Sequence, residues 1–141
     1  MTAVPPFHLA LPVPDLDAAR AFYLGVLGCS AGREAERWLD LDFWGHQVSL
    51  HLVDGGESVA TNAVDGDDVP ARHFGVVLPW GEWEALGERL RGAGVPFRIE
   101  PKVRFEGLAG EQGTFFVTDP GGNALEFKSF ADPAWLFARD P

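Results

Sequence analysis

The two halves of this 141-residue chain repeat the same pattern, and this internal repeat limits the folds available to it most strongly. His8 and His73 each stand near the start of a strand-like run, and Pro14 and Pro79 follow them six residues later. Each run precedes a helix-like stretch and then further strand-like runs. Self-similarity of this kind indicates a duplicated supersecondary unit. We therefore expect the order strand, helix, strands to occur twice.

Two stretches have the apolar spacing of helices and several others have that of strands. Apolar residues recur every three or four positions over Asp15–Leu27 and over Gly81–Arg91. Asp15 or Asp17 is placed to cap the first helix, and Gly28 follows its end. The predicted strands are Phe7–Val13, Arg37–Phe43, Gln47–Val53, His73–Leu78, Phe97–Ile99, Lys102–Phe105, Thr114–Thr118 and Ala124–Phe130.

The length fits one domain of ordinary size. We expect a first module over about 5–54 and a second over about 71–131, followed by a tail over 132–141. Between the modules, residues 55–70 are rich in Gly and Asp and show no periodicity, which predicts a solvated linker or loop.

The charge balance excludes several classes of partner. Asp and Glu number 21 against 11 Lys and Arg, which gives a formal net charge of −10. Nucleic acid and anionic membrane surfaces would repel such a chain. The sequence has no apolar run of about 20 residues and no signal-like N-terminus. A single cysteine, Cys29, allows no internal disulfide, so we expect a cytoplasmic protein.

Strand alternation places four chemically active side chains on polar strand faces. Along Gln47–Val53, His51 shares a face with Gln47 and Ser49, while the residues between them are apolar. Glu126 lies between two apolar residues of the last predicted strand, and a carboxylate in that position is seldom buried without a partner. A lone strand histidine is more often structural than functional.

Together, these side chains form a candidate ligand set. Each half offers a histidine on its first strand, His8 or His73, and a second group on its last strand, His51 or Glu126. Neutral imidazole and carboxylate both bind divalent transition metals well. These residues therefore predict a metal site, provided that the fold brings them together.

Two segments resemble a known family. FHLALPVPDLDAARAFYLGVLG opens the first half and TFFVTDPGGNALEFKSF closes the second. With the duplicated order of elements, they resemble the vicinal oxygen chelate superfamily, which includes glyoxalase I, bleomycin-resistance proteins, fosfomycin-resistance enzymes and extradiol dioxygenases. The resemblance implies an α+β fold of two tandem βαβββ modules that form a curved mixed sheet with a metal-binding cleft.

The resemblance also implies residue roles. His8, His73 and Glu126 match the positions of metal ligands in the family. His51 lies on the strand where glyoxalase I carries a glutamate that binds metal and acts as a base. This departure leaves three roles open for His51, namely fourth ligand, general base or substrate contact, and we expect His51 and Glu126 to be the catalytic residues. The implied cofactor is one divalent metal ion, Fe2+ or one of Zn2+, Ni2+, Mn2+ and Co2+.

The expected function is a metal-dependent enzyme that acts on a small oxygen-bearing substrate, either as a lyase or isomerase or as a ring-cleaving dioxygenase. The alternatives are a metal-free drug-sequestering protein of the bleomycin-resistance kind and a fosfomycin-type thiol transferase. The resemblance also implies a homodimer, and two arrangements of the site stay open: a site within one chain, or a site that combines His8 and His51 of one chain with His73 and Glu126 of the other.

A few further residues are weaker candidates. Lys128 and Arg104 could hold an anionic substrate group, although a surface position is equally consistent with each. His46, in the turn at Gly45, is expected to be exposed or to cap the turn. Asp119–Asn123 reads as a tight turn without chemistry.

Overall fold

The structure is a computed structural model that describes residues 4–54, 61–64 and 66–139. It divides into two compact units. The first comprises Met1–Ser58 with Asp119–Asn123, and the second comprises Val59–Thr118 with Ala124–Pro141. Each unit contains one four-stranded mixed sheet and one principal helix, which confirms the predicted duplication and the α+β class.

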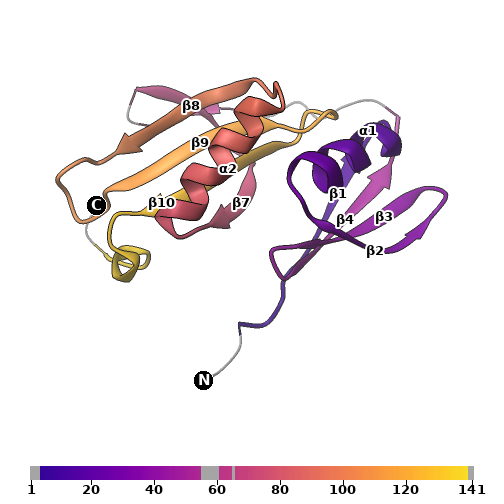
Figure 1. The fold of residues 1–141 in the computed structure, drawn as a ribbon, viewed down its shortest axis with the longest axis horizontal. Coiled ribbons are helices and arrows are strands. Elements are labelled where there is room, and N and C mark those ends of the chain that lie inside the picture. The colour runs from indigo at the N-terminus through magenta and orange to yellow at the C-terminus, as the bar shows by residue number, and fades with distance from the viewer. Residues whose placement is uncertain (1–3, 55–60, 65, 140–141) are drawn as a thin grey trace. The chain divides into compact units, whose positions relative to one another are not determined.

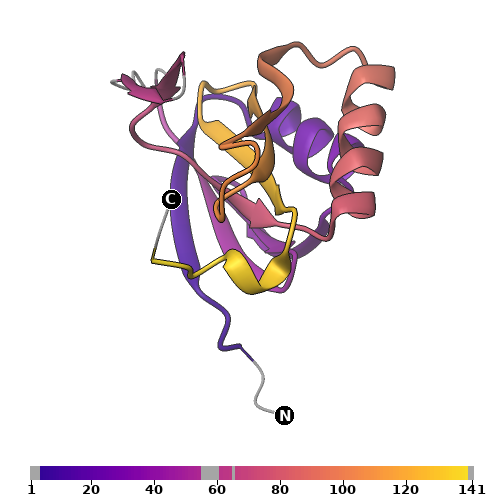
Figure 2. The same ribbon diagram turned by 90° about the vertical axis from the view of Figure 1, so that its left-hand side faces the viewer.

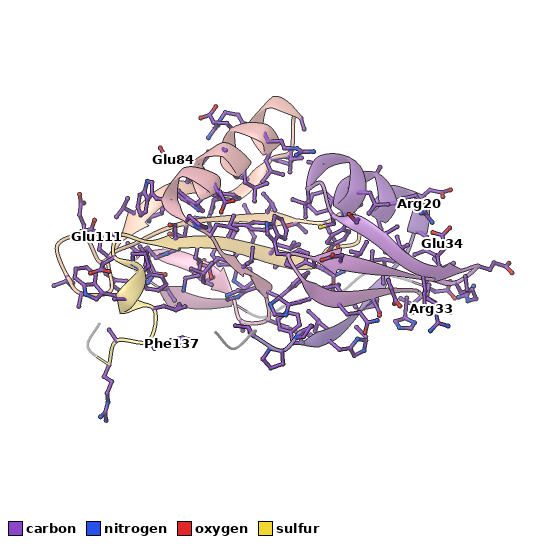
Figure 3. The ribbon with its side chains drawn as sticks, turned by 60° about the horizontal axis from the view of Figure 1, so that its bottom comes forward. Arg20, Arg33, Glu34, Glu84, Glu111 and Phe137 are labelled. Carbon is purple, nitrogen blue, oxygen red and sulfur yellow. The ribbon has the colours of Figure 1, made fainter. Side chains whose placement is uncertain are left out.

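In the first unit the strand order is β1-β4-β3-β2, with β1 and β4 parallel and the other pairs antiparallel. The elements are β1 (His8–Val13), α1 (Leu16–Arg20), β2 (Ser30–Ala35), β3 (Trp38–Phe43) and β4 (His46–Leu52). Figure 1 shows α1 lying across this sheet. Arg20 of α1 pairs with Glu34 of β2, with 2.9 Å between Nη1 and Oε2 (Figure 3).

The second unit repeats this arrangement with the order β7-β10-β9-β8, in which β7 and β10 are parallel. Its elements are β7 (Phe74–Val77), α2 (Trp80–Gly92), β8 (Phe97–Arg104), β9 (Gln112–Thr118) and β10 (Ala124–Phe130), followed by a 3-10 turn at Pro133–Trp135. Figure 2 shows α2 standing along one side of the sheet. Trp83 of α2 fixes the contact, since its Nε1 donates to the carbonyl of Phe127 at 2.9 Å and its ring lies 5.8 Å from the ring of Phe115, tilted by 31°.

The first predicted helix forms, but its second part is wound differently. Asp15 caps α1 by accepting a hydrogen bond from the amide of Ala18 at 3.0 Å, as the sequence predicts. From Ala21 to Val26 the chain continues as a π-helix. The amide of Leu27 donates to the carbonyl of Phe22, five residues earlier, at 2.9 Å.

Strand alternation separates an apolar face from a polar face in each sheet. In the first unit, Val48 and Leu50 of β4 are fully buried, while His8 and His51 are exposed. In the second, Phe115 and Phe127 face α2, so Thr114 and Glu126 lie on the opposite face, which also carries the buried Phe116. The functional candidates therefore lie on polar strand faces.

Within the segment expected to be a solvated linker, the described residues form two strands, so that expectation is wrong for them. Strands β5 (Thr61–Val64) and β6 (Asp67–Pro70) form an antiparallel hairpin, while residues 55–60 and 65 lie outside the described residues. Val64 and Val69 pack against Ile99 and Phe116. The sequence did not predict these strands because Val64 and Val69 stand in an acidic, Gly-rich segment without apolar periodicity.

Two further strands differ from the prediction. β2 was not predicted because its six residues are all exposed, so it has no apolar alternation to detect. The two runs predicted around Phe97–Phe105 join into the single strand β8, with register shifts near Ile99. None of the described helices has the length and apolar content needed to cross a membrane.

Candidate functional site

The second unit brings two predicted metal ligands together. His73 stands directly before β7, and Glu126 lies on the neighbouring parallel strand β10. His73 Nε2 is 3.1 Å from Glu126 Oε1, and the side chains are 28% and 12% exposed. The pair is thus largely shielded from water but still accessible to a ligand.

Each member of the pair is held by a second contact at its far atom. His73 Nδ1 lies 2.6 Å from the carbonyl oxygen of Pro70, and Thr114 Oγ1 donates to Glu126 Oε2 at 2.5 Å. Because carbonyl and carboxylate oxygens only accept, Nδ1 donates to Pro70 and Nε2 donates to Glu126; Nε2 would offer a lone pair to a metal ion only after losing its proton. The edge of Phe116 also packs on the imidazole, with 5.0 Å between ring centroids.

The electrostatics of the pair favour a protonated His73 beside an ionised Glu126. The hydrogen bond to Glu126 raises the pKa of His73 above its ordinary value, against a smaller opposing effect of burial. Burial alone would raise the pKa of Glu126, but hydrogen bonds from His73 and Thr114 and the charge of Lys128 together hold that pKa below its ordinary value. A cation at this position therefore meets an ionised carboxylate.

The donor pair fits a divalent transition metal. Two donor atoms that each lie about 2.1 Å from one ion, at an angle of about 90° at the ion, are about 3 Å apart. This is close to the 3.1 Å between His73 Nε2 and Glu126 Oε1. Metal-binding histidines commonly donate their other ring N–H to a carbonyl oxygen, as His73 does to Pro70. Within the described part of the chain, no third histidine, cysteine or carboxylate joins them in a cluster.

The first unit does not bring its own two predicted ligands together. His8 lies beside Gln47 in the parallel pair of β1 and β4, whereas His51 lies beside Pro12. The histidines are thus offset by four residues, about 13 Å along the strands. They share a polar face but cannot both bind one ion within this unit.

The strand register assigns a different counterpart to Glu126. Leu9 pairs with Val48 in the first unit as Phe74 pairs with Leu125 in the second, so Ser49 takes the place of Glu126. By the same register, His51 corresponds to Lys128.

The sequence contained a signal for this correspondence. Gly45 and Gly122, both with positive φ, each stand four residues before the matched position. Counting from these turn glycines identifies Ser49 without a structure.

A carboxylate that the sequence analysis missed lies beside Ser49. Ser49 Oγ donates to Asp40 Oδ1 at 2.5 Å, and Gln47 Nε2 lies 3.3 Å from Asp40 Oδ2. The first unit therefore has a hydroxyl on β4 and a carboxylate on β3, whereas the second has its carboxylate on β10 and its hydroxyl on β9. Alternation along Trp38–Phe43 could have revealed Asp40.

Two weaker candidates have structural roles. Arg104 is 3% exposed, donates to the carbonyl of Val64 at 2.7 Å and pairs with Asp67, so it holds the β5–β6 hairpin. His46 Nδ1 accepts from the amide of Phe7 at 2.9 Å, so it supports the residue before β1, whereas Asp42 caps the turn by accepting from the amide of Gly45 at 2.8 Å.

This architecture defines a protein built from two βαβββ modules. Residues 6–127 match the family model described as "Glyoxalase/Bleomycin resistance protein/Dioxygenase superfamily". The chain belongs to this superfamily, which confirms the predicted resemblance.

Individual relatives give the same result. A 1,2-dihydroxynaphthalene dioxygenase from Pseudomonas sp. (strain C18) is 31% identical over 122 residues, which cover 84% of this chain and 36% of that protein. This chain thus spans about a third of the length of the curated relatives it matches.

Solved structures agree over nearly the whole chain. A glyoxalase/bleomycin resistance protein/dioxygenase from Alicyclobacillus acidocaldarius has a TM-score of 0.81 and 36% identity, covering 94% of this chain and 96% of that one. A lactoylglutathione lyase from Agrobacterium tumefaciens shares the fold, with a TM-score of 0.63 and 19% identity over 92% of this chain and 96% of that one.

Proposed function

We propose that this chain is a metal-dependent enzyme that acts on a small oxygen-bearing substrate. The observation that carries the proposal is the 3.1 Å approach of His73 Nε2 to Glu126 Oε1, with the far atom of each side chain already hydrogen-bonded. These two residues would hold the ion, and His8 would provide a third ligand. When bound, a divalent ion supplies a Lewis acid for chelating substrate oxygen atoms.

The chain's own residues would prepare this site. The Pro70 carbonyl fixes the imidazole tautomer, and Thr114 fixes the carboxylate. We assign His51 a role in substrate contact or proton transfer, because the register places it at the counterpart of Lys128 and not of Glu126.

We place ring-cleaving dioxygenase chemistry first and lyase or isomerase chemistry second. The named relatives at about 30% identity are dioxygenases. A set of two histidines and one carboxylate is also the ligand type of non-haem iron oxygenases.

The chain would act as a homodimer.

The test combines metal loading with two substrate assays. The full chain is loaded anaerobically with Fe2+ and given 1,2-dihydroxynaphthalene while oxygen consumption is followed. A parallel sample loaded with Ni2+ or Zn2+ is given the hemithioacetal of methylglyoxal and glutathione. Turnover in either assay that disappears in Glu126→Gln supports the proposal and selects the reaction. A chain that takes up no metal contradicts it.

The second candidate is a metal-free protein that binds a cationic drug, favoured by the net charge of −10. Failure to bind metal, together with saturable binding of a cationic drug such as bleomycin, would establish this function instead.

A further inference from the structure

The polar face of the second sheet carries basic side chains with very different surroundings. Lys102 and Arg104 lie on β8 and both contact Asp67 Oδ2, each at 2.9 Å. Lys128 lies on β10, and no carboxylate of the described residues is within ion-pair distance of it. Its ammonium stands 5.4 Å from the ring centroid of Phe130. Lys128 therefore keeps a charge that no acidic partner neutralises in the described part of the chain.

Lys128 adjoins the proposed metal ligands. It is two residues beyond Glu126 on the same face of β10, about 7 Å along the strand. Thr114 and Val77 flank it on the neighbouring strands β9 and β7.

We propose that Lys128 is the subsite for an anionic group of the substrate, so that the substrate is a small acid whose carboxylate lies a few ångströms from its chelating oxygen atoms. This inference rests on the proposed function. The chain as a whole, at −10, disfavours anions, so an acidic substrate needs a local unneutralised cation. Phe130 beside the ammonium excludes some water and strengthens its attraction for a carboxylate.

Binding of two probes to the zinc-loaded full chain tests the proposal, because zinc supports no oxidation. The probes are 3,4-dihydroxybenzoate and catechol, which differ by one carboxylate. Zinc stoichiometry is measured first, and dissociation constants then follow from calorimetric titration. We expect the wild type to bind the acid about ten times more tightly than catechol, which corresponds to about 1.4 kcal/mol.

The variants assign this preference to Lys128. Lys128→Met and Lys128→Gln should each abolish the preference for the acid over catechol, and Lys128→Arg should keep most of it. Arg98→Met, which removes an exposed charge of β8, is the matched control and should change neither constant.

The outcomes separate this inference from the proposed function. Equal affinities of the zinc-loaded wild type for the two probes, or a preference that survives in both Lys128→Met and Lys128→Gln, would overturn the anionic subsite and leave the metal site intact. A wild type that binds no zinc overturns the proposed function, and the subsite fails with it.

Discussion

The hydroxyl of Tyr23 donates a hydrogen bond to Asp119, with 2.8 Å between Oη and Oδ2, across 96 residues of sequence. The other carboxylate oxygen of Asp119 accepts from the amides of Gly121 and Asn123, both at 2.9 Å. Asn123 Nδ2 in turn donates to the carbonyl of Pro12 at 2.9 Å. The turn between β9 and β10 is therefore built into the first unit, which explains why that unit includes Asp119–Asn123.

The alkaline stability of the protein should depend on Tyr23. Burial, with Asp119 beside it, raises the pKa of Tyr23 well above its ordinary value of about 10. Its stabilising contribution is thus complete below pH 10 and is lost as pH rises through the folded-state pKa. In urea unfolding, Tyr23→Phe should lose about 1–2 kcal/mol near neutral pH and then decline less steeply than the wild type above pH 10. Parallel declines would contradict this assignment.

Gly75 should tolerate no side chain. A Cβ there would collide with the backbone carbonyl of Glu126, because β7 and β10 approach closely at that point. Gly75→Ala should cost 3 kcal/mol or more, on the order of the largest overpacking effects, and should disturb the His73–Glu126 pair. Gly81→Ala is the matched control, since a Cβ there meets nothing within 4 Å. Thermal unfolding compares the two variants, and equal stabilities would contradict the close approach.

Acid should weaken the attachment of the β5–β6 hairpin. The hydrogen bond from Lys102, with the nearby Arg104, lowers the pKa of Asp67 against an opposing effect of burial. The stability it contributes is present above the ordinary pKa of about 3.9 and is lost as pH falls through the lowered value. Asp67→Asn should cost about 1–3 kcal/mol at pH 7, because Arg104 loses its anionic partner, and should flatten the acid limb of the stability curve. An unchanged acid limb would argue against this role.

His51→Gln should separate metal binding from turnover. The register sets His51 four residues along from His8, so the variant should keep the wild-type metal content. If His51 contacts substrate or transfers a proton, turnover should fall about 100-fold. Elemental analysis and the assay that proves active provide the two readouts. Loss of metal in this variant would instead make His51 a ligand.

The sequence predicted the fold because its main signals are local. Apolar spacing located both helices, and alternation located most of the strands that carry the core. It could not indicate β2, whose residues are all exposed, or the hairpin held by Asp67, whose partners lie on β8.

The candidate site was only partly predictable for a related reason. Histidine and carboxylate types suggested a metal, and His73 and Glu126 do meet. Their contacts to the carbonyl of Pro70, three residues before His73, and to Thr114 on the adjacent strand β9 depend on backbone geometry and strand register, which residue types do not encode. The position of His51 relative to His8 depends on the strand register, which the alternation of side chains along each strand does not determine.

The metal content of the purified full chain tests the central claim most directly. After loading with Fe2+ or Zn2+ and removal of free metal, the wild type should retain about one ion per chain, while His73→Gln and Glu126→Gln should each retain less than about a tenth as much, because each loses one donor. Glu84→Gln, which alters an exposed side chain of α2 (Figure 3), should match the wild type. A wild type without metal, or folded His73 and Glu126 variants that keep it, would contradict the account.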